Sequence, residues 1–343
     1  MTTLAVRLDN DGDVLLTGPA VRALAAHDDV DLLAGRSGAG AARLLPGVRD
    51  VLVVDAPWSG YRPPAVDPAA IDELVATLAA RRYDRAVIFT SFHQSPLPMA
   101  LLAKLAGIGH VAATSVDYPG SLLDVRHQRP EGLHEVEAAL ALARAAGAEL
   151  QGGDDGRLAV RRPLPDPTSF LADSRNSPVG GTRPYVVLHP GASVPARAIV
   201  PEHARAIAVA LVAAGWDVVV TGGPGEQPLA AGPGVHDLTG RTDLPQLAAV
   251  LDGAACVVVG NTGPAHLAAA VGTPVVSLFS PVVPAERWAP YGVPTVVLGD
   301  QLAACAGTRA RECPLAGHPC LTGIRPEQVA DAVASLVPQE VLA

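Results

Sequence analysis

Short apolar segments alternate along the chain with longer segments rich in Ala and Leu. The short segments are β-branched and bounded by Gly, Pro or Asp, which is typical of parallel strands buried on both faces. Strand–helix alternation of this kind predicts α/β domains built on doubly wound parallel sheets. The expected strands are Leu4–Leu8, Val30–Ala34, Val51–Val54, Ala86–Phe89, Tyr185–Leu188, Asp217–Val220, Ala255–Val259, Val275–Phe279 and Thr295–Leu298, and the expected helices include Pro68–Arg82, Glu131–Ala146, Pro201–Ala214 and Pro326–Leu336.

The alternation lapses once, between Gly152 and Pro184, where Gly and Pro are frequent. Such a density of turn residues marks a linker or hinge. A chain of 343 residues is also longer than one core usually supports. We therefore predict two Rossmann-like domains facing a cleft, residues 1–165 and 185–343, joined by a linker at 166–184.

Composition narrows the class of protein. Hydrophobic residues make up 49% of the chain and charged residues 17%, as in ordinary globular proteins. Only 3% of residues are aromatic and the net charge is −9, which argues against a nucleic-acid partner. The N-terminus lacks a signal-peptide pattern, and no apolar run approaches the roughly 18 residues that span a bilayer. We expect a cytoplasmic protein without a transmembrane segment, and peripheral contact with a membrane stays open.

Several common catalytic loops are missing from the sequence. The first expected strand leads into Asp9-Asn-Asp-Gly-Asp13, where a dinucleotide-binding domain has Gly-x-Gly-x-x-Gly. The single lysine, Lys104, lies outside any phosphate-binding P-loop motif. Neither the Gly-x-Ser-x-Gly elbow nor the His-Glu-x-x-His metal helix is present. The remaining candidates are folds that bind nucleotides without these loops.

The segment Asn261-Thr-Gly-Pro-Ala-His266 follows an expected strand and opens a helix that Gly272 closes. Asn261 or Thr262 can cap this helix, with Pro264 in its first turn. A helix N-terminus with free N–H groups favours anions, and Gly263 allows a ligand close approach. A capped helix with a satisfied His266 is the plainer interpretation.

Two further loops follow expected strands of the same domain. His189-Pro-Gly-Ala-Ser-Val-Pro-Ala-Arg197 combines a small-residue turn with an arginine that can bind phosphate through two hydrogen bonds. Thr221-Gly-Gly-Pro-Gly-Glu226 offers a carboxylate for ribose hydroxyls. The alternatives are an ordinary loop with a solvated arginine, and a glutamate favoured by a helix dipole. Because ligands bind at the carboxyl edge of such sheets, the three loops together predict a nucleoside-diphosphate pocket without a metal.

A fourth site, Arg7-Leu-Asp-Asn-Asp-Gly-Asp13, follows the first expected strand of the other domain. One of its aspartates could act as a general base on an acceptor hydroxyl, and a polar turn with Asp13 as helix cap is the alternative. A metal site here has weaker support, since no further ligand joins at a telling spacing. Other polar residues after strand ends are candidates for acceptor contacts: Asn10, His93, Gln94, Asp117 and Tyr118.

Four motifs in this order resemble glycosyltransferase family 9, the heptosyltransferase-type enzymes. They are the Arg7–Asp13 segment, His189-Pro-Gly-Ala-Ser193, the Thr221–Glu226 loop, and Val259-Gly-Asn-Thr-Gly-Pro-Ala-His266 with its continuation to Arg287-Trp-Ala-Pro-Tyr-Gly292. The resemblance covers nearly the whole chain. It implies a GT-B fold and an inverting transfer of a sugar, heptose or similar, from a nucleoside-diphosphate donor, typically ADP-linked, to an acceptor hydroxyl. It implies no cofactor and no metal.

The resemblance also implies roles for individual residues. Asp13 would be the catalytic base, and Arg197 would stabilise the leaving group while binding the diphosphate with Ser193. Glu226 would hold the ribose and Thr242 would lie beside the nucleobase. Sugar and phosphates would contact Asn261, Thr262, Gly263 and His266. The acceptor would be a glycan, a lipid-linked sugar or a secondary metabolite.

The sequence departs from the family pattern at three places. Asn261 stands where the heptosyltransferases usually have Asp, and Arg197 replaces a usual lysine. The Cys305–Cys320 loop carries Thr308 where another cysteine often sits, so we expect a structural loop, with zinc binding through its cysteines and His318 as the alternative. Two other functions also stay open: a GT-B-like protein that binds a nucleotide or glycan without turnover, and a nucleotide-sugar epimerase or hydrolase.

Overall fold

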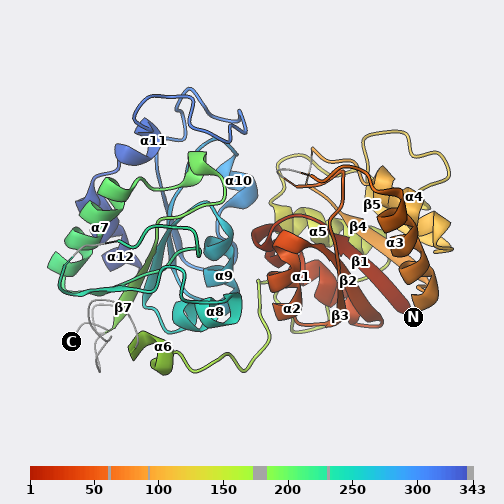
Figure 1. Ribbon diagram of the computed structural model, residues 1–343, viewed down its shortest axis with the longest axis horizontal. Coiled ribbons are helices and arrows are strands. Elements are labelled where there is room, and N and C mark those ends of the chain that lie inside the picture. The colour runs from red at the N-terminus through yellow and green to blue at the C-terminus, as the bar shows by residue number, and fades with distance from the viewer. Residues whose placement is uncertain (61–62, 92, 173–183, 230–231, 338–343) are drawn as a thin grey trace. The chain divides into compact units, whose positions relative to one another are not determined.

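The computed structural model describes residues 1–60, 63–91, 93–172, 184–229 and 232–337. The chain divides into two compact units, Met1–Arg161 and Arg162–Ala343 (Figure 1). Each unit holds a six-stranded parallel sheet with helices on both faces, which confirms the predicted fold class. The predicted linker at 166–184 includes the short helix α6 (Thr168–Ala172), and its residues 173–183 lie outside the described part of the chain.

The two sheets share one topology. The strand order is β3-β2-β1-β4-β5-β6 in the first unit and β12-β11-β10-β7-β8-β9 in the second. In each sheet the first and fourth strands of the unit lie side by side, and the chain runs outward from them in both directions, as in dinucleotide-binding folds. The strands are β1 (Thr2–Arg7), β2 (Asp29–Gly35), β3 (Val48–Val54), β4 (Arg85–Phe89), β5 (His110–Thr114), β6 (Val125–His127), β7 (Tyr185–His189), β8 (Asp217–Val220), β9 (Val235–Asp237), β10 (Cys256–Gly260), β11 (Val275–Leu278) and β12 (Thr295–Leu298).

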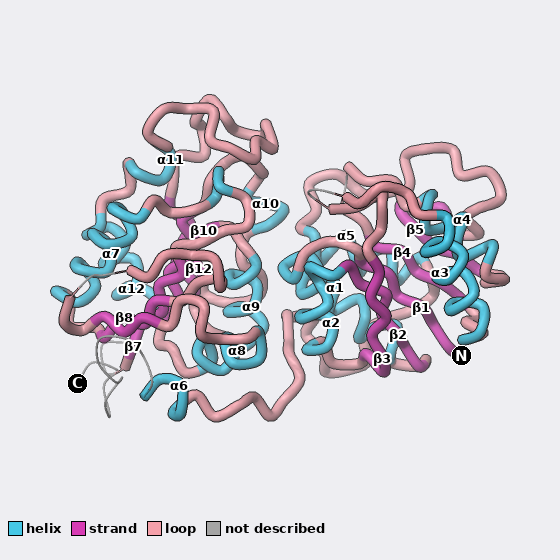
Figure 2. The backbone as a smooth tube through the Cα atoms, in the orientation of Figure 1, coloured by secondary structure: helices cyan, strands magenta, loops and turns pink. Residues whose placement is uncertain are grey.

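Helices cover both faces of each sheet (Figure 2). In the first unit α1, α2 and α5 pack together, and α3 and α4 pack against the other face. In the second unit α7 and α12 share one face with a buried apolar cluster, and α8 contacts α9. The remaining bounds are α1 (Asp11–Ala25), α2 (Ala39–Leu44), α3 (Pro68–Arg81), α4 (Leu97–Leu105), α5 (Glu135–Ala145), α7 (Pro201–Ala213), α8 (Leu244–Asp252), α9 (Gly263–Val271), α10 (Ala285–Trp288), α11 (Pro319–Thr322) and α12 (Pro326–Leu336), with 3₁₀ turns η1 (Arg36–Gly38) and η2 (Pro195–Arg197).

Local sequence signals set the helix ends. Asp67 caps α3 by accepting a hydrogen bond from the Ala69 N–H, and Pro68 occupies the first turn, where its missing N–H costs nothing. Asp243 and Gln246 form a reciprocal capping box at the start of α8. Gly272 ends α9 in the left-handed region at φ 93°, as the sequence predicted.

The sequence pattern misses three strands and misjudges the burial of two others. β5, β6 and β9 were not predicted, because they are short and weakly apolar. The expectation of strands buried on both faces is wrong for β3 and β12, several of whose residues are partly or fully exposed. These two strands lie at sheet edges, where one side has no neighbouring strand to cover it.

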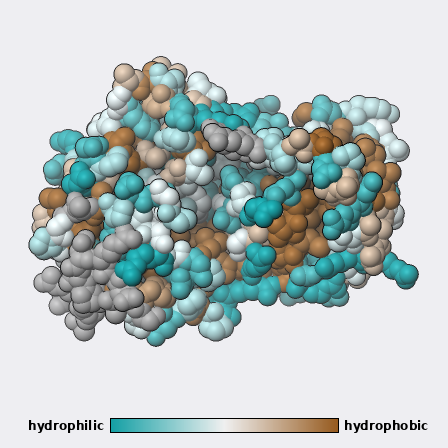
Figure 3. Space-filling view, in the orientation of Figure 1, coloured by the Kyte–Doolittle hydropathy of each residue, from teal (hydrophilic) through white to brown (hydrophobic). Residues whose placement is uncertain are grey.

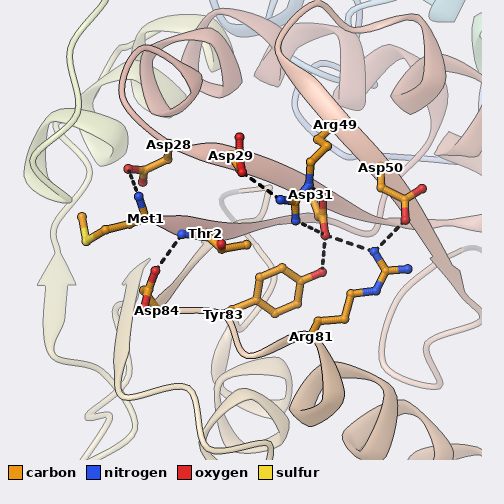
Figure 4. Close-up of polar contacts among 10 residues, drawn as sticks. All are labelled: Met1, Thr2, Asp28, Asp29, Asp31, Arg49, Asp50, Arg81, Tyr83 and Asp84. Atoms are coloured by element: carbon orange, nitrogen blue, oxygen red, sulfur yellow. Dashed lines mark hydrogen bonds and ion pairs between the residues drawn. The ribbon is translucent and has the colours of Figure 1, made fainter.

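A buried carboxylate ties the amino ends of the first sheet together (Figure 4). Asp31 of β2 is fully buried and accepts hydrogen bonds from Arg49 of β3, from Arg81 at the end of α3 and from the Tyr83 hydroxyl. Burial alone would raise the pKa of Asp31, but these donors hold it below its ordinary value. The network lies at the edge of the sheet opposite to the strand ends that carry the predicted site.

The surface view mixes hydrophilic residues with scattered hydrophobic areas (Figure 3). Among the residues that the structure describes, no helix has the length and apolar character needed to cross a membrane.

Candidate active site

Three predicted loops of the second unit meet at the carboxyl edge of its sheet. β7 and β10 are neighbours, so the loops that leave them start side by side at the point where the strand order reverses. A Cβ built on Gly260 would lie 2.5 Å from the Arg197 carbonyl oxygen, so the loop after β7 packs directly on the end of β10. This switch point is where open α/β sheets bind ligands.

The helix α9 begins at this edge. Its N-cap is Thr262, in an extended conformation with φ −141° and ψ 173°, and the Thr262 hydroxyl makes no capping hydrogen bond. Gly263 and Pro264 form the first turn, and His266 is buried just behind it. The positive end of the helix dipole, small residues and a hydroxyl therefore come together at one place, which suits an anion.

The side chain of Asn261 makes its hydrogen bonds within the protein. Its side-chain nitrogen donates to the Ser280 carbonyl, and its side-chain oxygen accepts from the Ser280 N–H, both at 3.1 Å. The pair is buried and joins the end of β10 to the segment after β11. An aspartate could not donate the first of these bonds. The paired hydrogen bonds give a physical reason for an asparagine at position 261, where the heptosyltransferases usually have aspartate.

The loop that carries Arg197 is held in place by contacts with the cysteine-bearing loop. Arg197 ends the turn η2 and is half-buried, whereas Ser193 is exposed. The preceding peptide is fixed on both sides, because the Ala196 N–H donates to the Arg311 carbonyl at 2.9 Å and the Ala196 carbonyl lies 3.1 Å from His318 Nε2. The cysteine-bearing loop therefore buttresses the segment that presents Arg197.

Glu226 folds back over the loop after β7. Its carboxylate fills the space that a Cβ would take at Gly191 and at Gly222, so a larger residue at either position would displace the Glu226 side chain. Burial raises the pKa of Glu226, and a hydrogen bond from the Gly223 backbone opposes that rise. Where these two loops begin, His189 and Thr221 form a buried hydrogen bond of 2.9 Å between the ends of β7 and β8.

Thr242 lies further along the same edge. It precedes Asp243, the cap of α8, and is partly buried. The Gly240 N–H donates to the Gly222 carbonyl at 3.0 Å, which joins the loop after β9 to the loop that carries Glu226. The structure thus brings Ser193, Arg197, Glu226, Asn261, Thr262, Gly263 and His266 onto loops in mutual contact, with Thr242 on the adjoining one.

In the first unit, Arg7 is the centre of the candidate site. It ends β1, and its buried side chain contacts Asp9 at 2.8 Å, Asp13 at 3.1 Å and the Ser91 hydroxyl at 2.9 Å. Burial alone would lower the pKa of Arg7, but the charges of Asp9, Asp13 and Glu135 raise it. Asp13 lies in the first turn of α1, and the N-cap is Asn10, so the alternative of Asp13 as the cap is wrong.

Gln94 makes two side-chain contacts within the first unit. Its side-chain nitrogen donates to Asp9 at 2.6 Å and its side-chain oxygen accepts from the Ser91 N–H at 3.0 Å. One N–H and the oxygen of the Gln94 amide thus join an internal network. Burial raises the pKa of Asp9 most, Asp13 adds to the rise, and Arg7 and Gln94 oppose it.

The other acceptor candidates lie on exposed loops. Asn10, His93, Asp117 and Tyr118 are all exposed at the carboxyl edge of the first sheet. Asn10 caps α1 through its backbone alone, since its side chain makes no capping bond.

No group of three or more metal-ligating side chains occurs among the described residues. Cys305 and Cys320 are buried in the apolar cluster of the second unit, and His318 contacts the backbone of Ala196. Burial raises the pKa of Cys320 to about 11, with further rises from Cys305 and Cys313. The Cys320 thiol is protonated at neutral pH, as in a structural loop.

Two residues important to the site carried no signal in the sequence. Ser91 and Ser280 are single serines in loops, and each acquires its role from a partner far along the chain. The contact of His318 with the Arg197 loop is equally non-local, although the sequence had marked His318 as a candidate zinc ligand.

Comparison with known proteins agrees with this geometry. Residues 71–318 match the model of glycosyltransferase family 9 (heptosyltransferase). Lipopolysaccharide heptosyltransferase 3 of Escherichia coli is 36% identical over 104 residues, which cover 28% of this chain and 31% of that protein, so the match spans about a third of the curated relative.

Two solved structures share the fold over almost their whole lengths. The ADP-heptose lipopolysaccharide heptosyltransferase II of E. coli has a TM-score of 0.73 and 22% identity, with 99% of each chain covered. A family 9 glycosyl transferase from Veillonella parvula has a TM-score of 0.79 and 17% identity, covering 98% of this chain and 96% of its own. With a family match over most of its length and a matching fold, the chain belongs to glycosyltransferase family 9.

Proposed function

We propose that the protein is an inverting, metal-independent glycosyltransferase. It transfers a sugar, heptose or one similar, from an ADP-linked donor to an acceptor hydroxyl. The observation that carries the proposal is the junction of the loops after β7 and β10, where the start of α9 meets the Arg197 loop. Family membership and the ADP-heptose named for the E. coli relative favour this donor.

The donor binds through its diphosphate in this proposal. Arg197 and Ser193 contact the phosphates from one side, and Thr262, Gly263 and His266 from the other. Glu226 accepts hydrogen bonds from the ribose, and Thr242 lies beside the nucleobase. Asn261 holds the turn in place through Ser280. Arginine and a helix N-terminus supply the positive charge that a metal ion supplies elsewhere.

The reaction is a single displacement. Asp13 removes the proton from the acceptor hydroxyl, whose oxygen attacks the anomeric carbon of the donor sugar. The bond from that carbon to the diphosphate breaks, and its electron pair leaves on ADP, whose new charge Arg197 stabilises. One displacement inverts the anomeric configuration.

The acceptor side is less defined. Asn10, His93 and Asp117 are exposed at the edge that carries Asp13, and we propose that they contact a glycan, lipid-linked or secondary-metabolite acceptor. Gln94 belongs to the same group, and it also binds Asp9 and Ser91 within the protein.

The test is turnover of ADP-heptose in EDTA with a panel of glycan acceptors, followed by NMR of the anomeric proton. We expect ADP release with inversion. The Asp13→Asn variant should be at least about 10²-fold slower with ADP affinity within about twofold, given the usual size of a base effect. If that variant kept more than about a tenth of the wild-type rate, Asp13 would not be the base. Dependence on added Mg²⁺ would overturn metal independence.

A further inference from the structure

One positive charge in the first unit is shared by two carboxylates. The Arg7 guanidinium contacts Asp9 through Nε at 2.8 Å and Asp13 through Nη2 at 3.1 Å. Its side chain is 4% exposed, and those of Asp9 and Asp13 are 11% and 23% exposed. Asp9 is thus the closer and the better shielded of the two partners.

Asp9 is fixed in place by a closed ring of three hydrogen bonds and its ion pair with Arg7. Gln94 donates to its second oxygen at 2.6 Å, and the Ser91 N–H donates to Gln94 at 3.0 Å. The ring closes where Arg7 donates to the Ser91 hydroxyl at 2.9 Å. Gln94 presents a donor to Asp9 and cannot exchange its two ends without breaking the Ser91 contact. Arg7 and Gln94 favour the ionised form of Asp9 and oppose the rise in pKa that burial causes, while the ring holds the carboxylate in place.

This arrangement matters for a base at position 13. A carboxylate that faces an undivided guanidinium is strongly stabilised as the anion and is a weak base. A second carboxylate on the same guanidinium neutralises that effect, and a catalytic base works best when its pKa is not far below the working pH.

We propose that Asp9, held by Gln94 and Ser91, is a positioning residue that neutralises Arg7 and so keeps Asp13 basic enough to deprotonate the acceptor. The proposal rests on the proposed function, in which Asp13 is the base. In this proposal Gln94 supports the same role by holding Asp9 in place.

Other charged groups face this cluster from neighbouring elements. Glu135 at the start of α5 acts on Arg7, and Arg129 neutralises Glu135 through a contact of 2.8 Å. His93, from the loop after β4, acts on Asp9. Asp11, on the same turn as Asp13, accepts from the Ala41 N–H at 2.8 Å. Asp11 thus has a separate partner and offers a matched control.

The test is a pH titration, from about 8 to about 3, of protein labelled with ¹³C at the aspartate carboxyl carbons, followed by NMR. Asp13 is assigned by its loss in Asp13→Asn. In Asp9→Asn we expect the Asp13 midpoint to fall by about one unit or more, or the group to stay ionised to about pH 3, since it gains Arg7 undivided and loses a like charge. The control Asp11→Asn should shift the midpoint by less than half as much.

A double variant keeps the test sound if the substitution at position 9 disturbs the ring. In Asp9→Asn with Gln94→Glu, the new amide at position 9 donates to the new carboxylate at position 94, which still accepts from Ser91, so the bonds and the net charge return. We expect at least half of the midpoint shift to be recovered. A shift in Asp9→Asn no larger than in the Asp11 control, or a shift upward, would overturn the proposal. These midpoints need no turnover, so failure of the proposed function would show separately as a fully active Asp13→Asn enzyme.

Discussion

Replacing Asp31 with Asn should destabilise the first unit strongly without touching the site. The carboxylate is fully buried and accepts from two arginines and from Tyr83. The side chains of Arg49 and Arg81 are 45% and 34% exposed, so after the change they can turn to water and to their second partners. The Tyr83 hydroxyl is buried and is left with a poorer acceptor.

The expected loss in the free energy of unfolding lies between two limits. A surface ion pair is worth at most about 1 kcal/mol, and breaking a buried pair costs about 3–5 kcal/mol. Because the carboxylate is buried and its arginines are half-exposed, we expect a loss of about 3 kcal/mol in the free energy of unfolding. At about 2–4 °C per kcal/mol for a unit of this size, the melting temperature falls by about 6–12 °C.

The assay is urea unfolding followed by circular dichroism, with Asp29→Asn as control. Asp29 pairs with the same Arg49 at 3.0 Å but is 68% exposed, so its loss should cost under about 0.5 kcal/mol. The folded-state pKa of Asp31 is lowered, so its contribution is complete above the unfolded value near about 4 and is lost as pH falls below it. Equal effects of the two variants, or a difference that persists undiminished well below about pH 4, would refute this reasoning.

Three further predictions concern the second unit. Gly260→Ala should abolish ADP binding measured by calorimetry, because its Cβ would lie 2.5 Å from the Arg197 carbonyl and displace that loop; unchanged affinity would contradict the packing. Asn261→Asp should lower the free energy of unfolding by about 1–3 kcal/mol in urea titration, since the Ser280 carbonyl loses its donor, whereas an unchanged value would refute the buried contact. Burial lowers the pKa of His189 to about 4, so this group stabilises the unit fully above the unfolded value near about 6.5, and about 3 kcal/mol is lost as pH falls towards 4. His189→Asn should remove that part of the pH dependence in urea unfolding, and an identical dependence in the variant would count against it.

The sequence was informative wherever one short segment determines the structure. The sequence predicted that α9 starts at Asn261 or Thr262 and ends at Gly272, and the structure has Thr262 as the N-cap and Gly272 as the C-cap, because helix ends depend on residues within one turn. The central strands were predicted from their apolar runs, since strands buried on both faces tolerate few polar residues. Strands such as β6, with Val-Arg-His, carry no such signal because they lie at a sheet margin.

The contacts that decide the site chemistry were beyond such reasoning. Arg7 could be seen as a basic residue before a polar turn, but its bond to Ser91 joins residues 84 positions apart. Gln94 followed a strand end and was expected to meet an acceptor, but its contacts with Asp9 and Ser91 could not be foreseen. Side-chain pairing across strands depends on register and rotamer, which a single sequence does not reveal.

The most direct measurement is calorimetric titration of the protein with ADP in the presence of EDTA, compared with UDP, GDP and CDP. ADP should bind without a metal and more tightly than the other nucleotides. Arg197→Met should weaken that binding about tenfold or more, since a charge-assisted contact to phosphate is lost. Absence of heat with every nucleotide, or binding only after Mg²⁺ is restored, would contradict a metal-free ADP-sugar site at the junction of β7 and β10.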